Sequence, residues 1–510
     1  MSDVRDPTRT AATGDDTGAT ITYACLSGDR LVSAPDLRGL LRAAGKVELE
    51  LDPIALSHLL HDGFVPFPRT IFKDVYALGI GDRAVLVERG GRPGLRFVDD
   101  FPFLDRHSAQ DQEPDPERLL RLLCASLERM LAGHGRATLM MSSGLDSVPL
   151  GLAAAEIGRA GDVTALTFDQ HGSGEGAAAA TFARRFGLRH VTVGFPDDRR
   201  EVAELVATFF ASADQPCCDP VMLAYVAALR QGGEGASVVI DGGGSDVYLG
   251  EPLSRRARLL DALHRPGLPD GWIGPVRSAV PFWSPLNKVA SSRCEKAFVD
   301  EYQLRHRETS PFFAGSVDTT ALWREQDRRW AGFTTHDLKA SVAGRRHDAN
   351  CSLLKARLVA AAHGAEAVFP WCDAELIDYC FNLPDQHRRM LPGGENKPLV
   401  RRLLRQRAGY DGVTQRRKVI FSFALREFLQ ANRALIEHEV LSCRLWAPSV
   451  GQTMALLWRA VAERRGTALA LHALFVTSAW LNHAGILVRG KRAGDPLGHA
   501  AEGSRVLGAA

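Results

Sequence analysis

Between residues 136 and 250 the chain alternates short apolar runs with longer segments that carry apolar residues at helical spacing. The runs of strand length are Ala137–Met141, Val163–Phe168, His190–Val193 and Ser237–Ile240. The segments of helical character are Ser147–Arg159, Glu175–Phe186, Arg200–Ser212 and Val221–Arg230. Apolar strands separated by helices pair in parallel, because the helical connections cover both faces of the sheet. This alternation predicts an α/β domain with a doubly wound parallel sheet.

The regions before and after this α/β pattern differ from it in composition and apolar spacing. A polar stretch without an apolar signal core predicts a disordered tail over residues 1–19, and short β-like runs interrupted by Gly and Pro mark residues 20–104 as a small β-rich part. The polar run Asp105–Glu117 predicts a linker before a helix at Arg118–Ala132. Residues 118–490 form the main unit, an α/β core to residue 250 and a mainly helical region over 251–490, and residues 491–510 are expected to be flexible.

Charge and cysteine content exclude several classes of protein. The 62 basic and 60 acidic side chains give a net charge of +2, which offers no global field for nucleic acid or an anionic membrane. The most membrane-like stretch, Ala468–Val488, is interrupted by polar residues and predicts a buried helix instead. Nine scattered cysteines without a CxxC pair indicate reduced thiols and a cytoplasmic location.

The segment 137–147 leads an apolar strand through small residues directly into a helix. Free N–H groups and the helix dipole favour an anion at such a junction, and Ser142, Ser143 and Gly144 would let phosphate oxygens approach the main chain. Ser147 could add a hydroxyl donor, and Asp146 is placed to hold a metal ion beside the phosphates. An ordinary capped helix start explains the same residues, so this segment alone leaves both interpretations open.

Further motifs occur along the chain. S-S-G-L-D-S at 142–147 resembles the S-G-G-x-D-S loop of N-type ATP pyrophosphatases, and D-G-G-G-S-D at 241–246 resembles the G-E-G-A-D-E region of asparagine synthetases. Similar matches follow that family's order at 214–220 (D-x-P…D-P), 364–373 (G-x-E-A-R-x-P-F-L-D), 396–401 (T-K-x-x-L-R) and 416–421 (R-x-K-x-G-F). The chain therefore resembles the synthetase domain of asparagine synthetases, whose relatives include β-lactam synthetases and lasso-peptide cyclases.

The resemblance implies the α/β fold of adenine nucleotide alpha hydrolase-like (PP-loop) proteins and activation of a carboxylate by ATP. Ser142, Ser143, Gly144 and Ser147 would cradle pyrophosphate, and Asp146 and Asp246 would ligate Mg²⁺. It further implies ATP contacts from Leu139, Phe168 and Gly242, and a catalytic lysine at Lys418. Lys397 and Arg401 are weaker candidates, because ordinary surface charges on a helix explain them nearly as well. Glu366 and Asp373 are expected to be architectural.

Two departures from the family limit what carries over. Asparagine synthetases have Glu, and β-lactam synthetases Tyr, where this chain has Gly243, so a general base must come from elsewhere, from the substrate, or be missing. The missing side chain is also expected to leave room for a bulky acyl group, and Val247 replaces a further acidic residue. Second, the chain starts Met1-Ser2, and Cys25 lies in an apolar run, which predicts a packed thiol. Residues 20–104 are too few for a glutaminase, so we expect a truncated remnant without glutamine hydrolysis.

These features predict an ATP- and Mg²⁺-dependent ligase that adenylates a small acid or peptide and joins it to an amine. Intramolecular cyclisation in natural-product biosynthesis is favoured, and amidation of a small acid by ammonia or a separate amine is the alternative. An ATP-using sulfur transferase fits less well without CxxC. A degenerate nucleotide-binding scaffold is suggested by Ser143, Gly243 and Val247 and opposed by Asp146, Asp246 and Lys418. No nucleic acid or membrane partner is expected, pathway proteins are possible partners, and the oligomeric state stays open.

Overall fold

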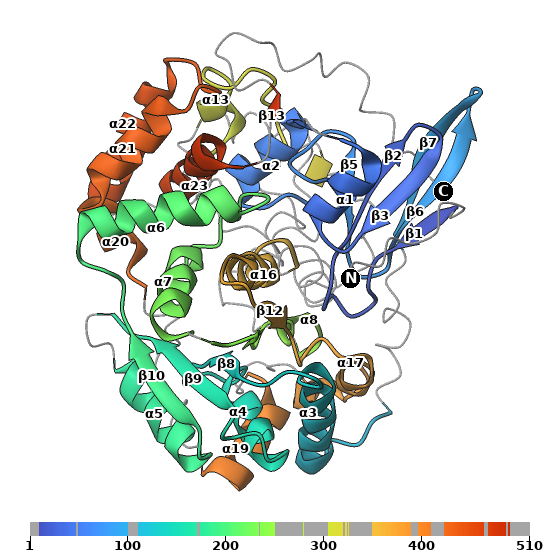
Figure 1. Ribbon diagram of the computed structural model, residues 1–510, viewed down its shortest axis with the longest axis vertical. Coiled ribbons are helices and arrows are strands. Elements are labelled where there is room, and N and C mark those ends of the chain that lie inside the picture. The colour runs from blue at the N-terminus through green and yellow to red at the C-terminus, as the bar shows by residue number, and fades with distance from the viewer. Residues whose placement is uncertain are drawn as a thin grey trace.

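A computed structural model gives the fold of the chain (Figure 1). It describes residues 10–46, 49–99, 111–170, 174–233, 235–249, 279, 304–319, 322, 323, 325, 349–388, 396–409, 423–463, 468–485, 488 and 489. Lys418, the predicted linker residues 105–110, much of the predicted helical region after residue 250 and the predicted tails at 1–9 and 491–510 lie outside these ranges.

A five-stranded parallel sheet forms the centre of the α/β part. Its strand order is β10-β9-β8-β11-β12, and every neighbouring pair is parallel. The strands are β8 (Ala137–Met140), β9 (Val163–Phe168), β10 (Arg189–Val193), β11 (Val238–Ile240) and β12 (Glu366–Val368). The first four confirm the strands predicted from the apolar runs. β12 is the strand that the alternation between residues 136 and 250 could not reveal.

Two layers of helices cover the sheet. Successive strand residues point to opposite faces, so Leu139 joins one hydrophobic cluster and Met140 the other. The Leu139 side of the sheet packs against α3 (Pro116–Met130), α4 (Val148–Glu156), α5 (Glu175–Arg185), α17 (Ala374–Phe381) and α19 (Pro398–Ala408). The Met140 side packs against α7 (Met222–Gly232) and α16 (Ser352–Ala362), with α6 (Arg199–Ser212) beyond them (Figure 1). The doubly wound architecture is thus confirmed.

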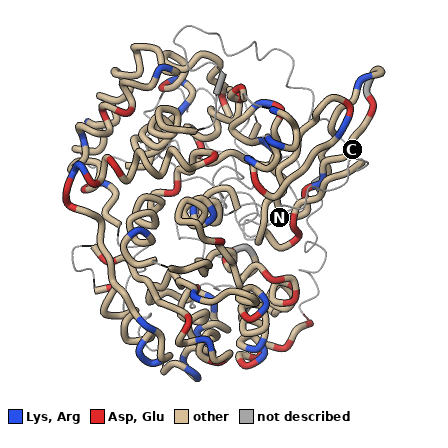
Figure 2. The backbone as a smooth tube through the Cα atoms, in the orientation of Figure 1, with Lys and Arg blue, Asp and Glu red and all other residues tan. Residues whose placement is uncertain are grey.

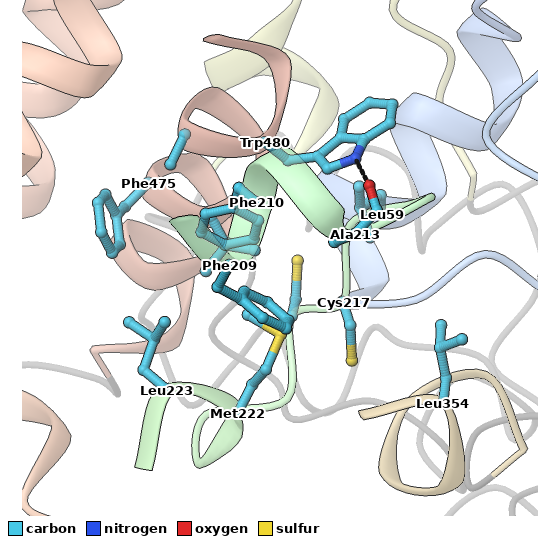
Figure 3. Packing of buried hydrophobic residues seen from close by; sticks show 14 of the residues in the cluster. Leu59, Phe209, Phe210, Ala213, Cys217, Met222, Leu223, Leu354, Phe475 and Trp480 are labelled. Atoms are coloured by element: carbon cyan, nitrogen blue, oxygen red, sulfur yellow. Dashed lines mark hydrogen bonds between the residues drawn. The ribbon is translucent and has the colours of Figure 1, made fainter. Parts of the chain in front are cut away.

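A helical region extends the hydrophobic cluster on the Met140 side of the sheet. Its helices are α13 (His306–Thr309), α20 (Leu425–Ala431), α21 (Arg433–Ser442), α22 (Val450–Ala462) and α23 (Leu469–His483). Two one-turn helices, α8 (Asp246–Leu249) and α18 (Asp385–Arg388), lie beside the sheet instead. In the packing around α6 and α23, Trp480 donates its indole N–H to the carbonyl oxygen of Ala213 at 3.1 Å, next to Leu59 (Figure 3). Residues 470–481 of α23 are all buried, as predicted for this apolar stretch. Of the helices that the structure describes, none combines the length and apolarity needed to cross a bilayer.

The N-terminal part carries two small antiparallel sheets, β3-β2-β5 and β1-β6-β7. Its elements are β1 (Ala11–Thr13), β2 (Thr22–Ser27), β3 (Arg30–Ala34), α1 (Leu37–Ala44), β4 (Leu49–Glu50), α2 (Pro53–Asp62), β5 (Val75–Leu78), β6 (Asp82–Arg89) and β7 (Arg92–Asp99). The disordered tail predicted for residues 1–19 is wrong for β1, because Ala11–Thr13 pair with β6. At the other end of the chain, β13 (Val488–Arg489) pairs in parallel with β4.

The N-terminal part packs directly on the rest of the molecule. Gln215 donates its side-chain amide to the Tyr23 hydroxyl at 2.6 Å, and Arg357 donates to the carbonyl oxygen of Gly18 at 2.6 Å. Cys25 lies in β2 with no exposed surface, and burial raises the pKa of its thiol. The prediction of a packed thiol at Cys25 is confirmed. All eight cysteines in the described ranges are free thiols.

Charged residues of both signs occur throughout the described backbone (Figure 2). Many of them form local pairs, such as Arg159 with Asp162 at 2.7 Å and Arg433 with Glu437 at 2.7 Å. This dispersion agrees with the near-zero net charge of the chain.

Candidate active site

The site lies where the direction of winding reverses in the central sheet. Numbered in chain order, its strands run 3-2-1-4-5, so the reversal falls between β8 and β11. The loops that leave neighbouring strands in opposite directions at such a point form a crevice at the carboxyl edge, which is where open α/β sheets bind ligands. The two loops here are residues 141–147 after β8 and residues 241–246 after β11. These are the two segments that the sequence motifs singled out.

The first loop is built around short side-chain contacts to its own main chain. The Ser147 hydroxyl accepts the N–H of Ser142 at 3.0 Å and donates to the carbonyl oxygen of the same residue at 3.0 Å. The Ser142 hydroxyl accepts the N–H of Gly144 at 3.1 Å. The loop then enters α4, whose N-cap residue Ser147 makes no side-chain cap. The capped helix start that the sequence left open is therefore not what the structure shows.

A carboxylate already binds to this loop. Glu175, at the start of α5, accepts both the main-chain N–H of Ser143 and its hydroxyl, the latter at 3.1 Å. Loop N–H groups at a helix start favour a negatively charged oxygen in that position. The loop therefore has the donor arrangement of an anion site, with Ser143 as one of its donors.

The second loop approaches the first so closely that glycine is required. A Cβ at Gly242 would lie 3.1 Å from the main-chain carbon of Asp146. Gly244 has φ +96°, and a Cβ there would lie 2.4 Å from the sulfur of Cys372. Residues other than glycine rarely adopt that φ. These two glycines let Asp146 and Asp246 come together across the crevice.

Lys397 connects the two carboxylates. Its ammonium nitrogen contacts Oδ1 of Asp146 and lies 2.6 Å from Oδ1 of Asp246. It also donates to the Ser245 hydroxyl at 2.8 Å, and Ser245 in turn donates to Asp146 at 2.7 Å. Burial by itself lowers the pKa of Lys397, but the charges of both carboxylates outweigh it and raise this pKa far above its usual value. Lys397 is therefore a fixed cation at the centre of the site.

The local chain holds Lys397 in a strained conformation. It precedes α19 with φ +49°, a left-handed conformation that is unfavourable for a residue with a side chain. Arg401, one turn into α19, donates to the carbonyl oxygen of Asn396 at 2.8 Å and thereby ties the preceding residue to the helix. The alternative that Lys397 and Arg401 are ordinary surface charges is excluded, because their residues are 2% and 8% exposed.

Other sequence-predicted residues occupy supporting positions. The side chains of Leu139 and Phe168 lie in the core, 0% and 2% exposed, and their contact with ATP stays a prediction. Asp373 caps α17 by accepting the N–H of Glu375 at 3.1 Å, which confirms an architectural role. Glu366 lies in β12 and is exposed. Trp371 donates its indole N–H to the carbonyl oxygen of Asp146 at 2.8 Å and was missed by the sequence reasoning.

Gly243 does not open space as expected. A Cβ at this position would meet Cδ2 of Leu353 at 2.4 Å, so Leu353 of α16 fills the volume where a side chain would begin. The expected room for a bulky acyl group is therefore absent at this position. The physical reason is that α16, which packs beside β11, places a leucine over the loop.

A buried polar network lies behind the second loop. Asp241 accepts the N–H of Gly243 at 2.7 Å through Oδ1 and the hydroxyl of Tyr225 at 2.6 Å through Oδ2. Lys355 lies 4.3 Å from the centre of the Tyr225 ring and 3.3 Å from Asp219. Burial and the charge of Asp241 raise the pKa of Tyr225 well above its usual value, so its hydroxyl stays a donor. Burial lowers the pKa of Lys355, but the charges of Asp219 and Asp241 outweigh it and raise this pKa.

The donor set of the crevice fits Mg²⁺. Two carboxylates and the Ser245 hydroxyl supply oxygen ligands, which Mg²⁺ prefers, and substrate phosphates commonly complete its shell. Asp146 and Asp246 already share one cation in Lys397. Within the described ranges no cluster of three or more His, Cys, Asp or Glu side chains forms a further metal site. The second loop and the first thus converge on a position suited to a cation between phosphate groups.

The fold defines an α/β synthetase domain of the PP-loop type, with two loops of small residues at the switch point of a parallel sheet. Residues 118–442 match the asparagine synthase family. Because this match covers more than half of the chain, the protein belongs to that family. The domain is thus that of an ATP-dependent ligase that forms carbon–nitrogen bonds from a carboxylate and a nitrogen donor. A comparison with curated proteins gives no match.

Proposed function

We propose that the protein adenylates a substrate carboxylate with ATP and Mg²⁺ and then joins the acyl group to an amine, releasing AMP and pyrophosphate. We favour an amine in the same substrate molecule, so that the product is a cyclised natural product. The observation that carries this proposal is the convergence of Asp146 and Asp246, from two different loops, on one cation at the switch point of the sheet.

Each part of the site has a role in this reaction. A carboxylate oxygen attacks the α-phosphorus of ATP, the bond to the β-phosphate breaks, and the departing pyrophosphate stays in the cradle of Ser142, Ser143, Gly144 and Ser147. Mg²⁺, when bound by Asp146 and Asp246, neutralises the charge of the phosphates. Lys397 adds a fixed positive charge at the same place. We assign Lys418 to the charge that develops around the α-phosphate.

The nitrogen attacks the acyl carbon in the second half-reaction. The bond to AMP breaks, and the nitrogen loses a proton to a base. We propose that glutamine is not the nitrogen source, because Cys25, the one cysteine before Cys124, is buried in β2. The free thiols of the described cysteines support a cytoplasmic location for this chemistry.

The test is acid-dependent exchange of labelled pyrophosphate into ATP. Purified protein, ATP and Mg²⁺ are mixed with aliphatic, aromatic and dicarboxylic amino acids, with N-acylated amino acids and with short peptides. We expect at least one class of acid to support exchange. Asp146→Asn and Asp246→Asn should each lower that exchange by at least about 100-fold, because removal of a charge-stabilising group from a preorganised site commonly has this effect.

A matched control is Asp162→Asn, since Asp162 forms an exposed pair with Arg159 far from the crevice. This variant should retain the wild-type exchange rate. If none of the acids supports exchange, although the protein still binds ATP, the ligase proposal is refuted and the nucleotide-binding scaffold is favoured. Product formation with glutamine that exceeds formation with ammonium chloride would refute the proposed nitrogen source.

A further inference from the structure

The second loop has lost the side chain that the resemblance places at residue 243, and a side chain could start there only if Leu353 moved. Leu353 occupies the position where that side chain would start, with Cδ2 2.4 Å from an ideal Cβ. The amine that attacks the acyl group must nevertheless lose a proton. The base therefore has to come from another residue of this neighbourhood or from the substrate.

A carboxylate oxygen lies next to residue 243. Oδ1 of Asp241 lies 3.0 Å from the point where a Cβ at residue 243 would be. Asp241 follows β11 at the carboxyl edge of the sheet, in the same loop as Ser245 and Asp246. Asp241, two residues earlier in the chain, thus places a carboxylate oxygen beside residue 243.

Asp241 is buried, and its two oxygens are hydrogen-bonded without being saturated. It is only 6% exposed, and each of its oxygens has one donor, the N–H of Gly243 and the hydroxyl of Tyr225. A carboxylate oxygen has two lone-pair directions, so each retains capacity to accept another proton. Lys355 and Arg357 of α16 supply positive charge near Asp241, and Asp219 supplies negative charge beside Lys355.

We infer that Asp241 is the general base for the amine in the amide-forming step and that Tyr225 positions its carboxylate. The amine nitrogen bonds to the acyl carbon, the bond to AMP breaks, and the proton of the nitrogen passes to a carboxylate oxygen of Asp241. This inference rests on the proposed function, because it concerns the second half of that reaction.

The test separates the two half-reactions in Asp241→Asn. Asn retains an oxygen for the N–H of Gly243 but removes the negative charge. Pyrophosphate exchange with the best acid of the panel should stay within about threefold of wild type, because adenylation needs no base on the amine. Amide formation with ammonium chloride should fall by about 100-fold or more, the usual contribution of a general base.

Hydroxylamine provides the second readout. It is a weaker base than ammonia, so its adduct releases a proton to water more readily. Hydroxamate formation from the same acid should therefore remain near the wild-type rate in Asp241→Asn. A merely structural role for Asp241 would lower exchange, amide and hydroxamate together, and that result would overturn the inference.

Asp52→Asn is the matched control. Asp52 is 8% exposed, accepts the N–H of Ile54 at 2.9 Å and accepts one side-chain donor, Arg69, at 2.6 Å. It lies at the start of α2, outside the site, and its variant should keep the wild-type ratio of amide to hydroxamate. Unchanged amide formation in Asp241→Asn would refute the inference alone. Absence of exchange in the wild-type protein would refute the proposed function and, with it, the inference.

Discussion

Replacement of Lys397 by Met tests whether this side chain holds the two loops together. The substitution keeps a similar volume but leaves Asp146 and Asp246 facing each other without a cation. Removing one partner from a fully buried ion pair costs about 3–5 kcal/mol. The side chain of Lys397 is 3% exposed, whereas those of the two carboxylates are 31% and 28% exposed, so water will solvate part of their charge. We therefore expect a loss of about 2–3 kcal/mol in the free energy of unfolding.

The assay is urea denaturation of both proteins without divalent cations, followed by fluorescence and circular dichroism. The pKa of Lys397 is raised in the folded state, so its stabilising contribution is fully present below the unfolded pKa of about 10.4 and is lost as the pH rises through the folded pKa. The loss in Lys397→Met should therefore be the same from about pH 6 to 9. Added Mg²⁺ should stabilise the variant more than the wild-type protein, because the two carboxylates no longer bind a lysine.

Lys73→Met is the control for an ordinary surface lysine. Lys73 lies 3.4 Å from Glu50 with a side chain that is 47% exposed, and its loss should change the free energy of unfolding by less than about 1 kcal/mol. Equal stabilities of Lys397→Met and Lys73→Met would refute the reasoning, since Lys397 would then be the exposed helix charge that its sequence context suggested.

Three further outcomes are expected. Gly244→Ala should lower the free energy of unfolding by about 1–3 kcal/mol more than Gly133→Ala, as measured in urea, because both have positive φ but only Gly244 would bring a Cβ against Cys372. Burial lowers the pKa of His472 from 6.5 to about 4. As the pH falls, this histidine therefore binds a proton in the unfolded chain at a higher pH than in the folded chain. Stability should then fall by about 3 kcal/mol between about pH 6.5 and 4, and this slope should be weaker in His472→Gln. Lys418→Ala should lower the rate of amide formation by at least about 100-fold in a product assay, and a wild-type rate would remove its assigned role.

The central sheet was largely predictable because its signals are local. Four of its five strands and the helices between them follow from apolar periodicity over residues 136–250. The fifth, β12, starts at Glu366, more than one hundred residues beyond β11, and its pairing with β11 has no local signal. In the helical region expected over 251–490, Asn432 separates α20 from α21, a boundary that the sequence analysis did not locate.

The candidate site was predictable in its loops and not in its centre. Asp146 and Asp246 follow strands that the pattern identifies, and parallel neighbours place both at one edge of the sheet. Lys397 joins Asp146 across 251 positions of sequence, and nothing in its neighbours distinguishes it from a surface lysine. Its strained φ of +49° is likewise not encoded by residue type, since Lys has no preference for that conformation.

The sequence by itself determined the alternation of strands and helices, the small residues of the two loops at the switch point and the carboxylates beside them. These features depend on residues close together in the chain, where periodicity and side-chain size act directly. Only the tertiary structure decided that Lys397 lies between the carboxylates, that Leu353 packs against Gly243, and that Asp241 places an oxygen beside the same residue. Each of those contacts depends on how separate elements pack or how a loop turns, and burial of apolar faces fixes that packing without regard to distance along the chain.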